Sequence, residues 1–183
     1  MVINVAQLLK AAVGTTRELD VDEDIATLDE RVQLARPVLG KVRLTRTNRG
    51  ILVSARLRTA AKLECSRCLE VYVEDLPIRF DEEYIPIVDV VSGLPTHIPH
   101  ESYAYLIDDK HEIDLRPAIR EYGVLTLPMK PLCSSECAGL CPQCGVNLNR
   151  QTCTCVVEAR DARFAPLEAL LSNEEPSEYQ DLT

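Results

Sequence analysis

Between residues 32 and 84, apolar and polar side chains alternate with a period of two. Such alternation is typical of strands with one buried and one exposed face, so three stretches predict long antiparallel strands: "VLGKVRLTR", "GILVSARLRTAAKLE" and "LEVYVEDLPIRFDEEY". The segment "TNRG" at 47–50 has the composition of a tight turn and closes the first predicted hairpin. A β-sheet is therefore the main predicted element.

The alternation also assigns the two faces of this hairpin. One side of the second strand carries apolar side chains, namely Ile51, Val53, Ala55, Leu57, Ala61 and Leu63. The opposite face, including the preceding strand, carries five cations: Lys41, Arg43, Arg56, Arg58 and Lys62. Ser54 lies among them. The first face is predicted to pack on the core. The second is either a solvated surface or a site for an anionic partner, and charge alone does not decide between these.

Helical spacing appears outside the predicted strands. The stretch "NVAQLLKAAVG" predicts an N-terminal helix that ends at Gly14, and "GTTRELDVDEDI" predicts an extended acidic segment after it. The stretch "HEIDLRPAIREYGVLTLPM" predicts a helix with Asp114 as its N-cap and Pro128 after its end. Near the C-terminus, "DARFAPLEALL" predicts a short amphipathic helix. His97 and His100 fall in a proline-rich connection and are expected on its surface.

Composition bounds the class of protein. A chain of 183 residues with 46% hydrophobic residues can bury a core of its own, so cysteines are not needed as its only source of stability. With no Trp and two Phe, that core must be aliphatic. No export signal is apparent, and no stretch approaches the roughly 18 apolar residues of a membrane span. The sequence therefore predicts a soluble cytoplasmic protein whose thiols stay reduced.

Charge is distributed unevenly along the chain. The net charge is −9, yet residues 31–70 hold ten Lys and Arg against two acidic residues. Residues 1–30 hold two basic and seven acidic side chains, and residues 81–136 hold four and eleven. A basic block inside an acidic protein is more informative than the total, because local fields determine which partners a surface attracts.

Residues 133–155 contain six cysteines and no histidine. In "CPQCG", the two-residue spacing lets a tight turn aim Cys141 and Cys144 at one point, where zinc accepts four thiolates tetrahedrally. Cys133 and Cys137 are the favoured second pair, with Cys153 and Cys155 as substitutes. A structural zinc contributes an apparent ~10–16 kcal/mol in finger peptides, against ~2–4 kcal/mol for a disulfide. Zinc is therefore favoured, with an iron–sulfur cluster or unliganded and redox-active thiols as the alternatives.

A second cysteine pair, Cys65 and Cys68, lies in "CSRCLE" between two predicted strands. Three interpretations remain open for it: a strand-to-strand turn with partly buried thiols, a half-site for a metal completed by the distal cysteines or a partner, and a redox pair. A thioredoxin-like redox pair has a helix that begins after the first cysteine, whereas predicted strands flank this pair. Arg67 adds a basic tip to the turn.

The predicted fold is α+β, with a twisted antiparallel β-sheet, a few helices and a C-terminal cysteine-rich zinc-binding knuckle. Residues 1–130 are predicted to form the sheet domain with its N-terminal helix. Residues 131–171 form the zinc module with a short helix, and residues 172–183 a disordered acidic tail. No phosphate-binding glycine loop, nucleophile elbow or His–carboxylate pair at metal spacing is present, so no enzyme is predicted.

The order of these motifs resembles the YceD family. The resemblance covers about residues 30–171 and rests on "CSRCLE", "EIDLRPAIREYGVLTLPMKPLC", "CAGLCPQCGVNLN", "CTC" and "DARFAPLEALL". It implies a non-enzymatic role in accumulation of large-subunit ribosomal RNA, hence in ribosome biogenesis. The implied partner is that RNA or its precursor, or a basic ribosomal protein.

The resemblance favours a binding role for the basic face over a merely solvated surface. With RNA as the partner, the implied phosphate contacts are Lys41, Arg43, Arg56, Arg58, Lys62 and Arg67. Because aromatic residues are scarce, recognition of shape and backbone is expected rather than base stacking. Two rival functions remain: a zinc-dependent transcription or protein-interaction adaptor, and a thiol oxidoreductase acting through Cys65 and Cys68.

Overall fold

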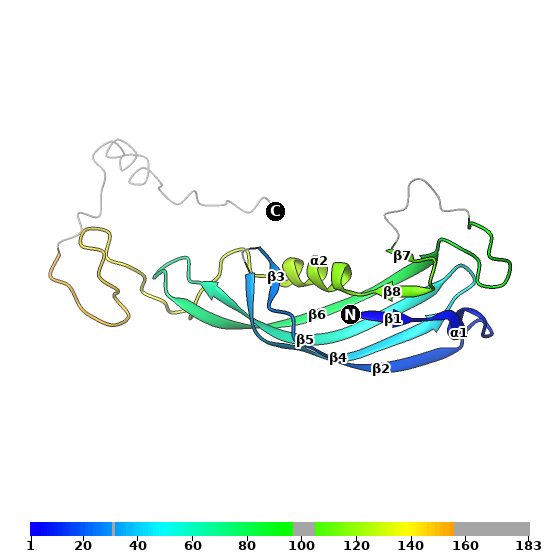
Figure 1. Cartoon of the computed structure of the whole chain (residues 1–183). Helices are drawn as coiled ribbons and strands as arrows, with labels where there is room; N and C mark the ends of the chain where they lie inside the picture. Colours follow the sequence, from blue (N-terminus) through cyan, green and yellow to red (C-terminus); the bar gives the residue numbers. More distant parts are fainter. Residues whose placement is uncertain (31, 97–104, 156–183) are drawn as a thin grey trace, which may run out of the picture. The chain divides into compact units, whose positions relative to one another are not determined.

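The computed structural model describes residues 1–30, 32–96 and 105–155, and Figure 1 shows its course. The chain divides into two compact units, Met1–Cys137 and a second unit that begins at Ala138. Cys133 and Cys137 therefore belong to the unit that contains the sheet. The predicted C-terminal helix, the acidic tail, His97 and His100 lie outside the described residues.

A mixed sheet forms most of the first unit. Its strand order is β2-β4-β5-β6-β7, with β3 paired to the start of β4; the bounds are β2 (Thr16–Glu23), β3 (Thr27–Asp29), β4 (Val32–Arg46), β5 (Ile51–Glu64), β6 (Val71–Pro86) and β7 (Tyr105–Ile107). Strands β4, β5 and β6 are the three long antiparallel strands predicted from the alternation, and that prediction is confirmed. The short β7 pairs with β6 in parallel, which the sequence did not predict.

The remaining elements lie on one face of this sheet, as Figure 1 shows. They are β1 (Val2–Asn4), α1 (Ala6–Leu9), β8 (Glu112–Asp114) and α2 (Arg116–Thr126), with β1 and β8 paired antiparallel. The expected N-terminal helix is only four residues long. It ends at Leu9, and farther along the chain Gly14, with φ +89°, donates its amide to the carbonyl of Arg46 at 2.8 Å, where the chain enters β2.

The face assignments made from the alternation are confirmed. The inward side chains of β5 are 0–1% exposed and join the aliphatic core beneath α2; they are Ile51, Val53, Ala55 and Leu57. On the opposite face of β5, Arg56, Arg58 and Lys62 are exposed. The rings of Phe80 and Tyr122 stack with centroids 5.1 Å apart, which fastens α2 to β6. We call the opposite side of the sheet, away from α2, the outer face.

Strand β4 is irregular in its first half. Its register with β5 shifts on both sides of Arg36, as in a β-bulge. Farther along, a Cβ at Gly40 would lie 2.2 Å from the carbonyl oxygen of Arg56, so only glycine allows β4 to approach β5 this closely. β4 therefore pairs irregularly with β5 around Arg36 and lies close against it at Gly40.

Candidate metal centres and the outer face

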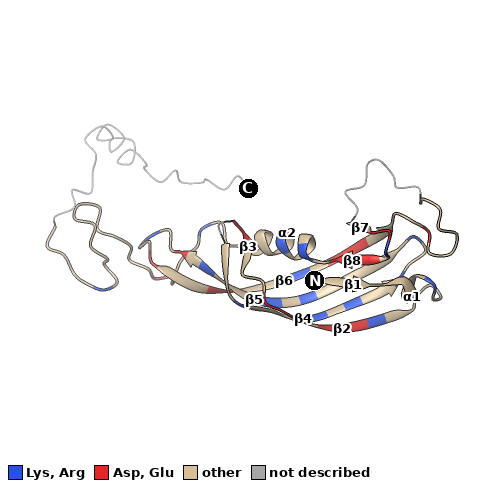
Figure 2. Cartoon of the chain, viewed as in Figure 1, with Lys and Arg blue, Asp and Glu red and all other residues tan. Residues whose placement is uncertain are grey.

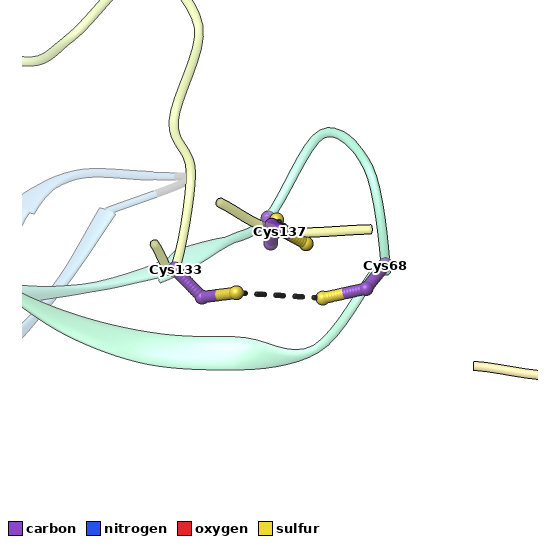
Figure 3. A group of neighbouring side chains, drawn as sticks. Cys68, Cys133 and Cys137 are labelled. Carbon is purple, nitrogen blue, oxygen red and sulfur yellow. Dashed lines mark hydrogen bonds between the residues drawn. The ribbon is translucent and has the colours of Figure 1, made fainter. Parts of the chain in front are cut away.

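Four cysteines of the first unit converge at the tip of the β5–β6 hairpin. Cys65 and Cys68 lie in the turn, Cys133 and Cys137 follow α2, and their sulfur atoms all lie within 4.8 Å of one another. The Sγ atoms of Cys65 and Cys137 are 3.8 Å apart. Those of Cys68 and Cys133 are 3.7 Å apart, and Figure 3 shows this contact with Cys137 beside it. Thiolates placed tetrahedrally at about 2.3 Å from zinc lie about 3.8 Å from each other. The spacing of this first cysteine cluster therefore suits zinc.

A second cysteine cluster lies within the second unit. It consists of Cys141, Cys144, Cys153 and Cys155, whose sulfur atoms also lie within 4.8 Å of one another. Here Leu140 and Asn147 form an isolated antiparallel bridge beneath the "CPQC" turn. An all-thiolate donor set with no carboxylate is the chemistry that zinc and iron–sulfur sites share.

The structure divides the cysteines differently from the favoured tetrad. Cys133 and Cys137 lie with Cys65 and Cys68 and do not join Cys141 and Cys144. The reason is a long-range contact: Ser66 in the hairpin turn donates its amide to the carbonyl of Pro131 at 2.9 Å, which brings the segment after α2 to the hairpin tip. Of the interpretations left open for "CSRCLE", the half-site completed by distal cysteines matches this placement.

The two C-x-x-C turns share one backbone conformation. In "CSRCLE" the first cysteine accepts a hydrogen bond at its carbonyl from the Leu69 amide and donates its own amide to the Glu70 carbonyl, each at 2.9 Å. In "CPQCGV" the Gly145 amide and the Val146 carbonyl make the same two bonds at the same distance. Leu69 and Gly145 both have positive φ, +60° and +72°. Each turn therefore aims two thiols at one point.

The thiols of each cluster titrate unequally. Backbone hydrogen bonds, chiefly from Cys133, outweigh burial and lower the pKa of Cys65 to about 6. The neighbouring thiol of Cys137, more than burial, raises the pKa of Cys133 to about 12. In the second cluster, backbone hydrogen bonds from Cys144 lower the pKa of Cys141 to about 6, and the Cys144 thiol raises that of Cys155 to about 12. Four adjacent thiolates repel one another, so full ionisation requires a cation among them.

Arg67 holds the first cluster together. Its guanidinium donates to the carbonyl oxygen of Cys137 at 2.8 Å and to that of Ser135 at 3.4 Å. This side chain was expected to contact phosphate, but the structure places it against the segment that supplies two of the four thiols. Such neighbours orient metal ligands.

Cations on the outer face form a cross-strand row. Lys41 of β4 lies directly opposite Arg56 of β5, which lies directly opposite Arg79 of β6. We call these three residues the cation row. Arg79 was missed from the sequence, although its position between inward-facing Ile78 and Phe80 was a signal that it points outward.

Acidic residues of the flanking strands neutralise part of this face. The predicted cations Lys41, Arg43 and Arg56 form ion pairs with acids of β2 and β6, at 3.9 Å to Asp20, 2.6 Å to Glu18 and 2.9 Å to Asp81. Figure 2 shows the acidic positions on β2 beside the basic ones on β4 and β5. Within the described ranges, Arg58, Lys62 and Arg79 form no ion pair. The outer face is therefore mixed, with unpaired cations along β5 and β6.

A family model described as "Large ribosomal RNA subunit accumulation protein YceD" matches residues 53–171, about two thirds of the chain. The chain belongs to the YceD family. The matched residues include both C-x-x-C turns, all eight cysteines and Arg79, whereas Lys41 and Arg43 precede them.

This YceD-family chain is also similar to individual proteins of known sequence. A chloroplast protein of Arabidopsis thaliana, named large ribosomal RNA subunit accumulation protein YCED homolog 1, is 28% identical over 152 residues, 72% of this chain and 47% of the relative. An uncharacterized protein of Mycobacterium bovis is 30% identical over 107 residues, 58% of this chain and 49% of that protein. The chain thus spans about half the length of these relatives. No solved structure matches it. Neither helix in the described part of the chain is long and apolar enough to cross a membrane.

Proposed function

We propose that this YceD-family chain is a non-enzymatic factor that supports accumulation of large-subunit ribosomal RNA, and that it binds this RNA or its precursor through the outer face of the sheet. The observation that carries the proposal is the cation row. Like charges directly opposite each other on neighbouring strands destabilise a sheet by roughly 0.2–1 kcal/mol per pair. Lys41, Arg56 and Arg79 form two such pairs in succession. An anionic partner relieves this repulsion.

The ion pairs of the outer face are compatible with RNA binding. Exposed pairs such as Arg56–Asp81, whose side chains are 54% and 50% exposed, contribute only about 0–1 kcal/mol. A phosphate can therefore replace the carboxylate at small cost. The neighbouring acids still weaken the attraction, so this face binds RNA reversibly and only where several phosphates are presented together. Each phosphate contact adds about −0.7 to the slope of log affinity against log salt on a single strand.

Zinc is proposed as the structural cofactor of both cysteine clusters. When bound, zinc supplies a charge that lets four thiolates lie together. The chain's own contribution at the first cluster is to hold the segment 131–137 against the hairpin tip through Ser66, Arg67 and the four cysteines. The thiols of Cys65 and Cys68 are buried and lie beside two further thiols, an arrangement that favours a metal ligand over a redox pair.

Crosslinking and sequencing of RNA bound to the tagged protein tests the RNA partner. The informative variant is Arg56→Glu/Arg58→Glu. The matched control is Lys10→Glu/Lys110→Glu, which changes the net charge equally at exposed positions outside the cation row. We expect discrete peaks on large-subunit precursor RNA that disappear in the first variant and persist in the control.

Two other outcomes would contradict the proposal. Equal loss of peaks in both variants would make net charge, and not the outer face, the cause of binding. No enrichment of RNA with the wild-type chain would move the function to a protein partner, either a basic ribosomal protein or the target of an adaptor. The acidic side chains of β2 would then be the first surface to examine.

A further inference from the structure

The outer face contains a pocket where β4 departs from regular pairing. β4 loses its register with β5 around Arg36, and the next residue, Pro37, has no amide with which to restore the ladder. An open pocket of about 520 Å³ lies beside this irregularity. This volume lies within the ~300–1,000 Å³ range of small-molecule sites. We call it the bulge pocket.

The walls of the bulge pocket are largely apolar, and its rim carries two arginines and the carboxylate of Asp75. Pro37, Leu39, Leu76 and Pro77 line it, together with the guanidinium-bearing side chains of Arg36 and Arg58. Leu39 is 45% exposed although it lies in the middle of a long strand. The one buried polar side chain at the pocket, Thr59, already donates its hydroxyl to the carbonyl of Arg36 at 2.8 Å. The pocket therefore offers packing surface and two cations, one of them paired with Asp75, and few buried polar groups that could recognise a ligand by hydrogen bonds.

Charge is continuous between this pocket and the cation row. Arg58 lies directly opposite Leu39 on one side and Pro77 on the other, so no carboxylate faces it across either strand. Arg36 is held by Asp75 at 3.0 Å, but that pair is 62% and 80% exposed and is easily opened. Along β5, Arg58 lies between Arg56 of the cation row and Lys62, and all three side chains are exposed. A ligand that fits has one compact apolar group and adjacent anionic groups.

We propose that the bulge pocket takes one unpaired base of the bound RNA, with the flanking phosphates on Arg58 and the cation row. This inference rests on the proposed function and adds a preference to it. A base inside a duplex cannot enter the pocket, so the chain selects single-stranded or bulged RNA over continuous helix. Because the walls pack against the base and do not read its edges, selection among the four bases is weak.

Fluorescence anisotropy with two labelled probes tests this inference: a 12-nucleotide single-stranded RNA of mixed sequence and the corresponding blunt duplex. The wild-type chain is expected to bind the single strand more tightly. Leu39→Asn lowers single-strand affinity on the order of tenfold, as for loss of one apolar packing contact, and leaves duplex affinity and the salt slope unchanged. Arg58→Gln reduces the salt slope on the single strand by about 0.7.

Leu106→Asn is the matched control, because Leu106 is 46% exposed in β7 and lies outside the pocket. Equal loss of affinity in Leu39→Asn and Leu106→Asn would overturn the base pocket, as would equal affinity of the wild type for the two probes. In both cases the protein still binds RNA and the proposed function stands. Displacement of the RNA by a poly-glutamate peptide that itself needs Leu39 would overturn the inference in favour of an acidic protein ligand. No binding of either probe would mean that the proposed function had failed.

Discussion

Leu69 and Gly145 occupy equivalent positions in the two C-x-x-C turns, each directly after the second cysteine. Both have left-handed backbone conformation, with φ of +60° and +72°. Glycine adopts this conformation without steric cost, whereas any residue with a Cβ loses roughly 1–2 kcal/mol. Leu69 is 56% exposed, so burial of its side chain offsets little of this cost. The first turn is therefore strained in a way that the second is not.

Exchange of the residue at these two positions should have opposite effects on stability. Leu69→Gly is expected to raise the free energy of unfolding by roughly 0.5–1 kcal/mol, after allowance for the added freedom of glycine in the unfolded chain. Gly145→Ala is expected to lower it by a similar amount, because an added Cβ there meets no atom within 4 Å and the backbone alone bears the cost. Denaturant unfolding with zinc present measures both. A destabilising Leu69→Gly would contradict the strain.

The grouping of the cysteines predicts the zinc content of serine variants. We expect two zinc ions per wild-type chain, one in Cys68→Ser, one in Cys144→Ser and none in the double variant. Native mass spectrometry or atomic emission gives these counts. The alternative tetrad of Cys133, Cys137, Cys141 and Cys144 predicts no loss in Cys68→Ser. Cys68→Ser is therefore the decisive variant, because it disrupts a site only under the grouping in the structure.

Arg67 is expected to support zinc binding more than RNA binding. Arg67→Ala removes the hydrogen bond to the Cys137 carbonyl and should weaken zinc binding at the first cluster about 10–100-fold. Competition with a chromophoric chelator measures this change, and Arg67→Lys should recover part of the affinity. Arg79→Ala serves as the control, since it should weaken RNA binding without altering zinc affinity. If Arg67→Ala weakened RNA binding and left zinc affinity unchanged, Arg67 would belong to the RNA-binding surface and not to the zinc site.

The cation row should lower stability as well as attract anions. Arg79→Thr replaces one cation with a good strand former and is expected to raise the free energy of unfolding by roughly 0.2–1 kcal/mol at low salt. The gain should shrink at high salt, where the repulsion with Arg56 is screened. Unfolding at two ionic strengths measures it. A loss of stability at low salt would mean that Arg79 makes a favourable contact and that the row carries no repulsion.

Acid should weaken the start of α2 through Asp114. The hydrogen bonds from Arg116 hold the pKa of this carboxyl below its usual range, one of them from the helix's own backbone amide at 3.0 Å. A lowered folded-state pKa means that the stabilisation is present above the unfolded pKa of about 3.9 and is lost as pH falls through the folded value. Asp114→Asn should lower the melting temperature at pH 7 by no more than about 4 °C and have a smaller effect at pH 3. An equal shift at both pH values would exclude the charge as the cause.

How much of this was predictable depends on whether a feature is local in the chain. The strands β4, β5 and β6 follow from alternation of neighbouring residues, and Ile51 to Leu57 are buried as that alternation requires. The N-terminal helix was overestimated: it ends at Leu9, and Gly14, expected at its end, instead bonds to Arg46, 32 residues away. The sequence of residues 11–14 alone cannot indicate that contact.

The features of the candidate site also divide into those that are local in the chain and those that depend on contacts between distant segments. The amino-acid order alone determined two C-x-x-C turns and the outward side of Lys41, Arg56 and Arg58, since each depends on residues a few positions apart. Only the tertiary structure decided that Cys133 joins Cys65, that β2 and β6 neutralise part of the basic strands, and that a bulge opens a pocket beside Arg58. The physical reason is that thiol clusters, ion pairs and pockets form between segments distant in the chain, and their geometry exists only once strand pairing has set which side chains are neighbours.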